Sequence, residues 1–366
     1  MASTHDFGSL SSKGKAMIEA LPAPEATNSW IRPSNNAPSN PDSHQFHAHG
    51  FLKVNSFVTS EEADEMIAQM TKLVDESWHP GDPSTPSAVF RTDEKQESAQ
   101  GSSDYFLDSA DRVHFFAEKD ALKADGTPST SSKVLALNKS GHGLHVCDPL
   151  FQSYSTSSKI ASLVRSLGWV DPRIPQSMYI FKQPRIGGEV TSHQDSTFLH
   201  TEEASSGEPA QSCLGLWLAL HPATVENGCL WVRPGSHREP LRRRFVRNPK
   251  RFVEGDDKAP QMIFEDCPGG QASAAPWEGK LPEDSWPPPS EGLFAAGFVP
   301  VECEAGDLVV FPGTLDHLSL PNYSSKPRHT FQLHMVEGPG GGRKWSSSNW
   351  LQYGGGKEFV GVGMGE

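Results

Sequence analysis

Two histidines and an aspartate have the types and the spacing that could hold a metal ion. His193 and Asp195 are separated by one residue, and His317 follows far along the chain. Two imidazoles and one carboxylate on one face of an ion form the ligand set of non-haem Fe(II) oxygenases. Such a set leaves the opposite positions open for a cosubstrate and O₂. We therefore expect these three residues to be metal ligands and catalytic residues.

The segments around the three residues favour their meeting at one site. In an extended segment, side chains two residues apart point the same way, so His193 and Asp195 can reach one ion. A turn at Gly187–Val190 precedes them. Before His317, the run Gly306–Gly313 predicts a turn, a buried strand and a loop that presents His317 at its far end.

Zinc is the alternative ion, because it also accepts His and Asp ligands. The chain has 15 His, so a His-x-Asp triplet arises easily by chance, and His317 alone could be an ordinary histidine at a strand end. Hydrolytic zinc sites often carry a His-Glu-x-x-His helix motif, which the sequence lacks. A zinc hydrolase is therefore the weaker hypothesis.

The elements that must position these residues are helices early in the chain and short strands later. A cap at Thr59 or Ser60 opens a run with helical apolar spacing, and Leu150–Leu167 predicts a second helix. Short apolar runs bounded by Gly, Pro and Asn predict strands at His49–Val54, Val113–Phe116, Ser177–Phe181, Cys213–Leu220, Cys229–Val232, Asp307–Phe311 and His329–Val336. This order predicts a mainly β fold with flanking helices, a β-sandwich or jelly roll whose mouth brings distant residues together.

The domain boundaries follow from changes in composition. Residues 1–45 are rich in Pro, Ser and Asn and predict a flexible N-terminal segment, with at most a short helix around Gly14–Leu21. Residues 46–353 form the expected domain, and 354–366 a C-terminal tail. Within the domain, residues 248–298 are a long Pro- and Gly-rich insertion, which is either a lid over the site or partly disordered.

A basic cluster lies just before this insertion, with three consecutive arginines at 242–244 followed by Arg247, Lys250 and Arg251. The favoured interpretation is a solvated turn between strands. The alternative is a clamp for a phosphorylated or carboxylated substrate tail.

Charge and cysteine content narrow the partners and the compartment. The net charge is −13, which disfavours nucleic acid and anionic membranes as partners. Five Cys without a Cys-x-x-Cys pair argue against a disulfide framework and for a reducing, intracellular and cytoplasmic location. The sequence has no apolar run long enough to span a bilayer, no secretory signal and no peroxisomal address.

Several separated motifs resemble the phytanoyl-CoA dioxygenase family, in its branch of domain-containing proteins. The motifs are Gln176–Pro184, Gly187–Val190, His193–Asp195, Glu226–Trp231, Pro234–His237, Asn138–His145 and Asn349–Gln352. They fall in the family's order, and the resemblance runs from Phe46 to Gln352. The family's peroxisomal enzyme carries a targeting presequence without a counterpart here, so we assume neither that location nor an acyl-CoA substrate.

The resemblance implies an Fe(II)- and 2-oxoglutarate-dependent oxygenase on a double-stranded β-helix, a cupin-like jelly roll. His193, Asp195 and His317 match the iron ligands, with ascorbate as a possible reductant. Arg328 matches the anchor of the 2-oxoglutarate distal carboxylate, which a planar guanidinium can pair through two charge-assisted hydrogen bonds. Taken alone, Arg328 could be a surface residue, and Lys326 is a nearby competitor for this role.

Three further residues match cosubstrate-contacting positions of the same branch: Lys139, Met178 and Trp217. Lys139 could add a positive charge beside the oxoacid, whereas Met178 and Trp217 would wall the site. For these last two, plain core packing is the alternative.

The sequence thus predicts an oxidoreductase that hydroxylates a small organic molecule and releases succinate and CO₂. The alternative is a catalytically silent jelly-roll module that binds 2-oxoglutarate or a metal. The intact ligand set favours the enzyme, because loss of a ligand would be the simplest sign of the silent module.

Overall fold

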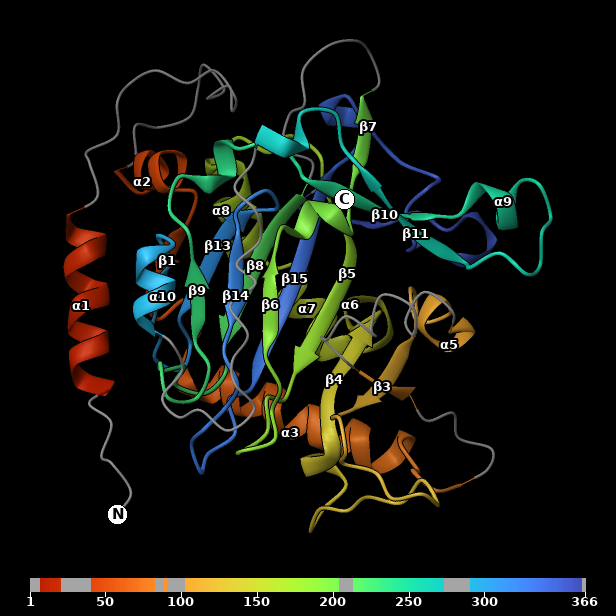
Figure 1. Cartoon of the computed structure of the whole chain (residues 1–366), viewed down its shortest axis with the longest axis horizontal. Coiled ribbons are helices and arrows are strands. Elements are labelled where there is room, and N and C mark those ends of the chain that lie inside the picture. Colours follow the sequence, from red (N-terminus) through yellow and green to blue (C-terminus); the bar gives the residue numbers. More distant parts are fainter. Residues whose placement is uncertain are drawn as a thin grey trace.

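The structure is a computed structural model that describes residues 7–20, 41–82, 88–90, 103–203, 213–272 and 290–363. Two β-sheets, one large and one small, pack face to face (Figure 1). The large sheet runs in the order β1 (Leu52–Val54), β13 (Leu308–Pro312), β8 (Cys213–Ala219), β15 (Thr330–Glu337), β5 (Pro172–Ile180), β4 (Leu137–His142), β3 (Val113–Ala117) and β2 (Ala88–Val89). A further strand, β17 (Val360–Gly361), also pairs with β5.

The small sheet has the order β12 (Val299–Val301), β9 (Leu230–Val232), β14 (His317–Ser319) and β6 (Val190–His193). Its apolar side chains meet those of the large sheet in a shared core, in which Trp217 and Phe311 of one sheet join Val232 and Leu318 of the other. The predicted β-rich jelly roll is therefore confirmed.

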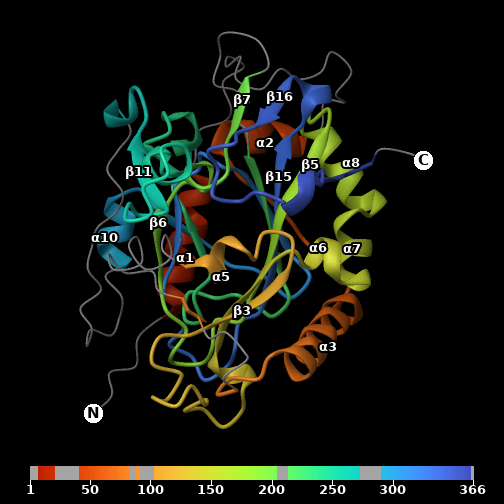
Figure 2. The same cartoon turned by 90° about the vertical axis from the view of Figure 1, so that its right-hand side faces the viewer.

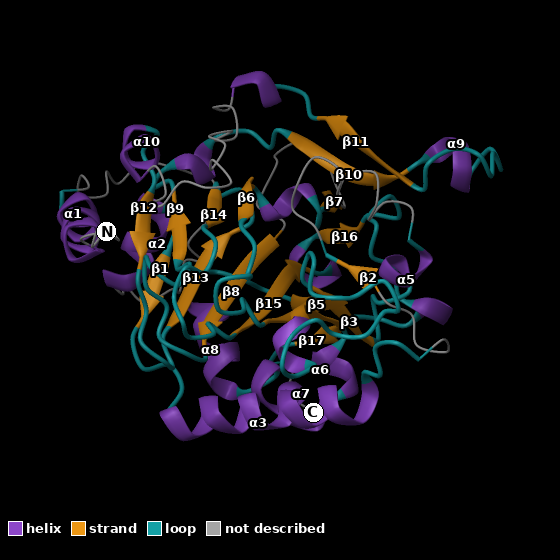
Figure 3. Cartoon of the chain, turned by 60° about the horizontal axis from the view of Figure 1, so that its bottom comes forward, coloured by secondary structure: helices purple, strands orange, loops and turns teal. Residues whose placement is uncertain are grey.

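Helices cover the outer face of the large sheet (Figure 2 and Figure 3). They are α3 (Ser60–Ser77), α6 (Leu144–Cys147), α7 (Pro149–Ser155) and α8 (Ser158–Ser166). Met70, Phe151 and Val164 of these helices are fully buried against Tyr179 and Leu333 of the sheet. Helices pack on one face of the large sheet, and the small sheet packs on the other, so the large sheet is rigid. Its face toward the small sheet is called the floor below.

The predicted cap of the first of these helices is confirmed. The Thr59 hydroxyl accepts a hydrogen bond from the Glu62 amide, and the Glu62 carboxylate accepts one from the Thr59 amide. The single helix predicted over Leu150–Leu167 is wrong, because the chain breaks at Thr156. The Ser157 hydroxyl then caps α8 by accepting from the Ile160 amide.

The N-terminal segment contains more structure than its composition predicts. Helix α1 (Phe7–Glu19) packs on β12, and helix α2 (Pro41–His49) leads into β1, across the expected boundary at residue 46. Residues 1–6 and 21–40 lie outside the described residues. The strand predicted over His49–Val54 is shorter, since its first residue still belongs to α2.

The basic cluster differs from its favoured prediction, and part of the insertion forms regular structure. Strands β10 (Arg243–Arg247) and β11 (Met262–Asp266) form an antiparallel hairpin with α9 (Pro249–Phe252) near its tip, and it projects from the body (Figure 1). The arginine run is thus a strand rather than a solvated turn. Residues 273–289 lie outside the described residues, after which α10 (Ser290–Ala295) leads to β12.

Three short elements complete the described segments. Helix α5 (Asp104–Leu107) precedes β3, and β16 (Arg343–Trp345) pairs with β7 (Thr201–Glu203). Within the described residues, no helix combines the length and the apolar character needed to cross a membrane.

Candidate metal centre

The small sheet brings the two predicted histidines to adjacent strands. His193 ends β6 and His317 begins β14, and the two residues are directly opposite in the antiparallel register. Their ring centroids lie 4.2 Å apart. Each Nδ1 faces a backbone carbonyl, at 2.7 Å from Thr191 and 3.0 Å from Leu315 respectively. The Nδ1–H groups donate to these carbonyls, so both Nε2 lone pairs are free to bind a metal.

Asp195 joins the histidines from a turn, not from a strand. Strand β6 ends at His193, and Asp195 starts the 3₁₀ turn Asp195–Thr197. Gln194 between them is still extended, at φ −115° and ψ 124°, so the two side chains point the same way, as expected. The Ser196 amide donates to the Gly313 carbonyl at 2.9 Å and ties this turn to the loop before β14.

The three side chains form a compact group that could hold one ion. Their potential ligand atoms all lie within 4.8 Å of one another. Asp195 Oδ1 is 3.3 Å from His193 Nε2 and 3.6 Å from His317 Nε2. Within the described segments, this is the group of His, Cys, Asp or Glu side chains that meets the geometry of a metal site.

Glycine is required at two positions beside the group. A Cβ on Gly313 would lie 2.4 Å from Ser196 Oγ, so the turn that carries Asp195 could not approach the loop. A Cβ on Gly215 would lie 2.8 Å from the Phe311 ring and 3.2 Å from Asp195 Oδ2. The large sheet thus leaves space for the carboxylate directly above Gly215.

The electrostatics favour the metal-binding forms of His317 and Asp195. Burial and the neighbouring His193 lower the pKa of His317 to about 4, so its imidazole is neutral at pH 7. Burial alone would raise the pKa of Asp195, but His317 and His334 outweigh it and hold that pKa well below its usual value. For His193, burial lowers the pKa and Asp195 raises it, with a net increase that a bound cation would oppose.

Arg328 is buried close to Trp217. Only 2% of Arg328 is exposed, and its guanidinium carbon lies 5.2 Å from the Trp217 ring centroid. Its Nη1 donates a long hydrogen bond of 3.5 Å to Thr330, whereas its Nε has no partner among the described residues. Burial lowers the pKa of this guanidinium to about 10, which leaves it charged at neutral pH. Lys326, the competing anchor, is exposed on the surface.

The two predicted wall residues lie on the same face of the large sheet. Met178 and Trp217 both pair in register with Gln332, one from each side. Residues directly opposite on neighbouring strands share a face, so the three side chains form one row across the floor of the site. Trp217 is also part of the core, while Met178 is only partly buried.

Lys139 lies further along this floor, inside an aromatic cage. Its ammonium is 3.9 Å from the Phe90 ring centroid and 5.2 Å from that of Phe116, and it lies 3.4 Å from His142 Nε2. Burial lowers the pKa of Lys139 to about 7. No carboxylate of the described residues forms an ion pair with it, so the cage holds Lys139 without neutralising it.

The basic cluster does not form an open clamp. Arg242 donates two hydrogen bonds, of 3.0 and 3.1 Å, to the Asp316 carboxylate. Arg247 donates to the carbonyls of Asn349 and Trp350. Arg244 lies opposite Glu265 in the hairpin register. These arginines anchor the hairpin to the loop before β14 and to the C-terminal segment.

Sequence reasoning missed His334 and Gln176. His334 Nε2 lies 3.0 Å from Asp195 Oδ2, and Gln176 Nε2 lies 3.0 Å from His334 Nδ1. A signal was present, because His334, Gln332 and Thr330 alternate along one strand and must share the face that carries the site.

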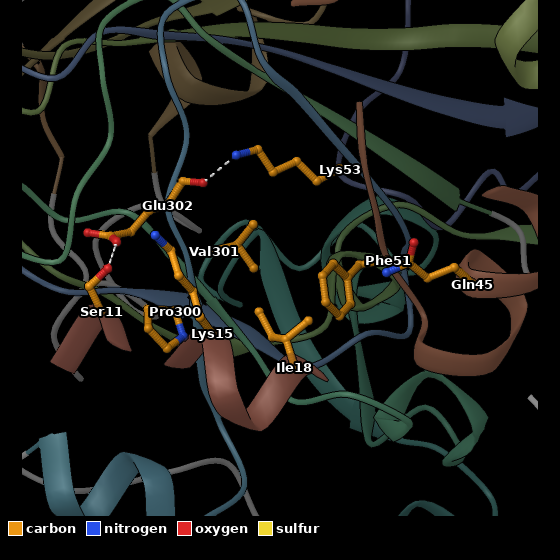
Figure 4. A pocket seen from close by; sticks show the side chains of 9 residues that line it. All are labelled: Ser11, Lys15, Ile18, Gln45, Phe51, Lys53, Pro300, Val301 and Glu302. Atoms are coloured by element: carbon orange, nitrogen blue, oxygen red, sulfur yellow. Dashed lines mark hydrogen bonds between the residues drawn. The ribbon is translucent and has the colours of Figure 1, made fainter. Parts of the chain in front are cut away.

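A cavity lies away from these residues. It has a volume of about 200 Å³ and lies between α1, β1 and β12 (Figure 4). Its lining residues are Ser11, Lys15, Ile18, Gln45, Phe51, Lys53, Pro300, Val301 and Glu302. None of the predicted site residues is among them.

Known proteins resemble this chain in sequence over most of its length. The pattern that defines the phytanoyl-CoA dioxygenase family matches residues 46–330. A phytanoyl-CoA dioxygenase of Arabidopsis thaliana is 39% identical over 307 residues, which is 84% of this chain and 91% of that protein. The phytanoyl-CoA dioxygenase domain-containing protein 1 of Mus musculus is 38% identical over 309 residues, 84% of this chain and 92% of that protein.

Solved structures resemble the chain in fold. The epimerase SnoN, in complex with Fe³⁺, alpha ketoglutarate and nogalamycin RO, has a TM-score of 0.51 at 14% identity, over 88% of this chain and 94% of that one. The carbocyclase SnoK has a TM-score of 0.50 at 14% identity, over 82% of this chain and 84% of that one.

Proposed function

Because the chain belongs to the phytanoyl-CoA dioxygenase family, we propose that it is an active iron- and 2-oxoglutarate-dependent enzyme that hydroxylates a small organic molecule. The sequence predicts an oxidoreductase, which is also the enzyme class of this family. The observation that carries the proposal is the intact His193, Asp195 and His317 group, whose ligand atoms lie within 4.8 Å of one another.

The donor set fits iron. Two neutral imidazoles and one carboxylate on one side of an ion leave the other side open. Iron bound there would supply the redox chemistry that couples decarboxylation of 2-oxoglutarate, to succinate and CO₂, with hydroxylation of the substrate. The protein's part is to fix the ligands, bind the oxoacid and keep the site dry.

The floor of the site fits 2-oxoglutarate. His334 touches Asp195, and Thr330 touches Arg328, so the two contacts are four residue steps apart along β15. That length is about 13 Å, part of which the Arg328 side chain spans. An oxoacid with a carboxylate at each end could chelate the ion and reach Arg328, lying over the row formed by Met178, Gln332 and Trp217.

Arg328 gives the strongest support for an anionic cosubstrate. A buried guanidinium with an unpaired Nε is costly unless a ligand completes its hydrogen bonds. A carboxylate would do so through two parallel bonds. We assign Lys139 a supporting role, in which its charge favours acid groups on the same floor.

The test is succinate formation by the purified chain. We expect protein incubated with Fe(II), ascorbate and 2-oxoglutarate to release succinate, with more when a true substrate is present. Asp195→Ala, which removes one ligand, should reduce the rate by at least about 100-fold. 2-Oxoglutarate binding is measured alongside under anaerobic conditions. Binding without succinate above the Asp195→Ala level, across candidate substrates, would favour the silent module instead.

A further inference from the structure

The two carboxylate oxygens of Asp195 have different partners. Oδ1 faces the histidine pair, at 3.3 Å from His193 Nε2 and 3.6 Å from His317 Nε2. Oδ2 points the other way and lies 3.0 Å from His334 Nε2. The carboxylate is therefore oriented before any ion binds, with one oxygen already occupied.

A second residue fixes the hydrogen on the His334 ring. Gln176 is directly opposite His334 in the sheet register, and its amide nitrogen lies 3.0 Å from His334 Nδ1. An amide N–H can only donate, so Nδ1 must accept. In the neutral ring, Nε2 then carries the hydrogen and donates to Asp195 Oδ2. Both Gln176 and His334 are buried, at 5% and 4% exposure, so water does not compete for these bonds.

We propose that His334 and Gln176 are positioning residues that restrict Asp195 to binding the metal through Oδ1 alone. This inference rests on the proposed function. An octahedral ion with two imidazoles and one carboxylate oxygen keeps three positions, which a chelating oxoacid and O₂ would fill together. A carboxylate that bound through both oxygens would occupy one of these positions. His334 and Gln176 thus keep the oxygen position open.

The experiment measures Co(II) binding to the full chain, because Co(II) reports its coordination through visible d–d absorption without turnover. His334→Leu should weaken Co(II) binding by about 10- to 100-fold and change the shape of the d–d spectrum. Gln176→Leu retains the imidazole but frees its tautomer, and should produce a smaller change in the same direction. If His334→Leu does not fold, Gln176→Leu decides the matter.

The matched control is His145→Leu. His145 is also fully buried and also has both ring nitrogens hydrogen-bonded, to Ser177 at 2.9 Å and to the Ile174 carbonyl at 3.0 Å. It should lose thermal stability yet keep the wild-type Co(II) affinity and spectrum. Wild-type affinity and spectrum in both His334→Leu and Gln176→Leu would overturn the inference, as would an equal loss in His145→Leu. A wild-type chain that binds no Co(II) would instead overturn the proposed function itself.

Discussion

Arg328 and Lys139 are buried cations that no carboxylate of the described residues neutralises. Arg242, by contrast, is paired with the buried Asp316 carboxylate. Unpaired buried charge is expensive, so it is expected where a ligand supplies the missing partner. Lys139 lies in β4 of the large sheet, and Arg328 lies just before β15 of the same sheet.

Replacing Arg328 should weaken cosubstrate binding. Arg328→Lys keeps the charge but loses the planar pair of donors, so the dissociation constant for 2-oxoglutarate should rise by about 10- to 100-fold. Anaerobic titration of the Fe(II) protein measures it. Lys326→Met is the control, because that exposed side chain should not contribute. Equal losses in the two variants would contradict the assignment of Arg328.

Replacing Lys139 should reveal the cost of burying its charge. The folded-state pKa is about 7 against an ordinary value of 10.5. The destabilisation is therefore complete below pH 7, declines as pH rises from 7 to 10.5, and vanishes above. Contacts with the aromatic rings offset part of it. Lys139→Met should stabilise the ligand-free protein by about 1–3 kcal/mol near pH 6, and by less near pH 9.

Urea unfolding at the two pH values measures this difference. Lys119→Met, at an exposed position, should show no such dependence on pH. A Lys139→Met protein that is less stable than wild type at both pH values would show that the cage stabilises the cation more than burial penalises it.

The ligand residues could be predicted from the sequence, but their supporting residues could not. His193, Asp195 and His317 have a recognisable spacing and flanks, whereas His334 and Gln176 are single polar residues within apolar strands. Their role depends on which strands are neighbours and in which register, and β5 and β15 are separated by about half the chain. Only the folded arrangement shows that they meet Asp195.

At the scale of elements, helix α1 depends on one close approach to the small sheet. Gly14 faces β12, where an added Cβ would lie 2.6 Å from Pro300 Cγ. On the same helix, Lys13 lies over the Phe294 ring and Ser11 donates to Glu302, which also borders the pocket in Figure 4. The contact holds an N-terminal helix against the edge strand of the small sheet, which also carries His193 and His317.

Gly14→Ala should release this helix even though alanine favours helices over glycine by up to about 1 kcal/mol. The expected result is faster amide hydrogen exchange over residues 7–19 with little change elsewhere. Lys15→Ala, one residue along but exposed, should keep the protection of the wild type. Slower exchange in Gly14→Ala would mean that helix propensity outweighs the contact with Pro300.

Element prediction succeeded where local chemistry is decisive and failed where tertiary contacts decide. The Thr59 cap and the strand at Asp307–Phe311 follow from adjacent residues. The break at Thr156 falls inside a continuous apolar pattern, and periodicity alone does not reveal it. The arginine strand β10 is polar by composition. It is fixed by its hairpin partner β11 and, through Arg242 just before it, by Asp316, which is distant in sequence.

At the scale of the whole molecule, the two sheets contribute different residues to the site. The small sheet and the turn after β6 carry the His193, Asp195 and His317 group. The large sheet carries Trp217 and the Gln176–His334 pair, and Arg328 lies just before its strand β15. The helices behind the large sheet make it rigid, which fixes the distance between the metal group and Arg328. The family and the jelly roll could both be predicted from ordered motifs along the chain. The substrate could not be predicted, because it depends on the side chains that line the mouth of the jelly roll.

The most direct test of this account is a crystal structure of the protein grown anaerobically with Fe(II) and 2-oxoglutarate, with data collected at the iron absorption edge. The account predicts one anomalous peak between His193, Asp195 and His317, with Asp195 bound through Oδ1. It also predicts the distal carboxylate of 2-oxoglutarate on the Arg328 guanidinium, beside Trp217. Iron held by other residues, or 2-oxoglutarate bound away from Arg328, would contradict it.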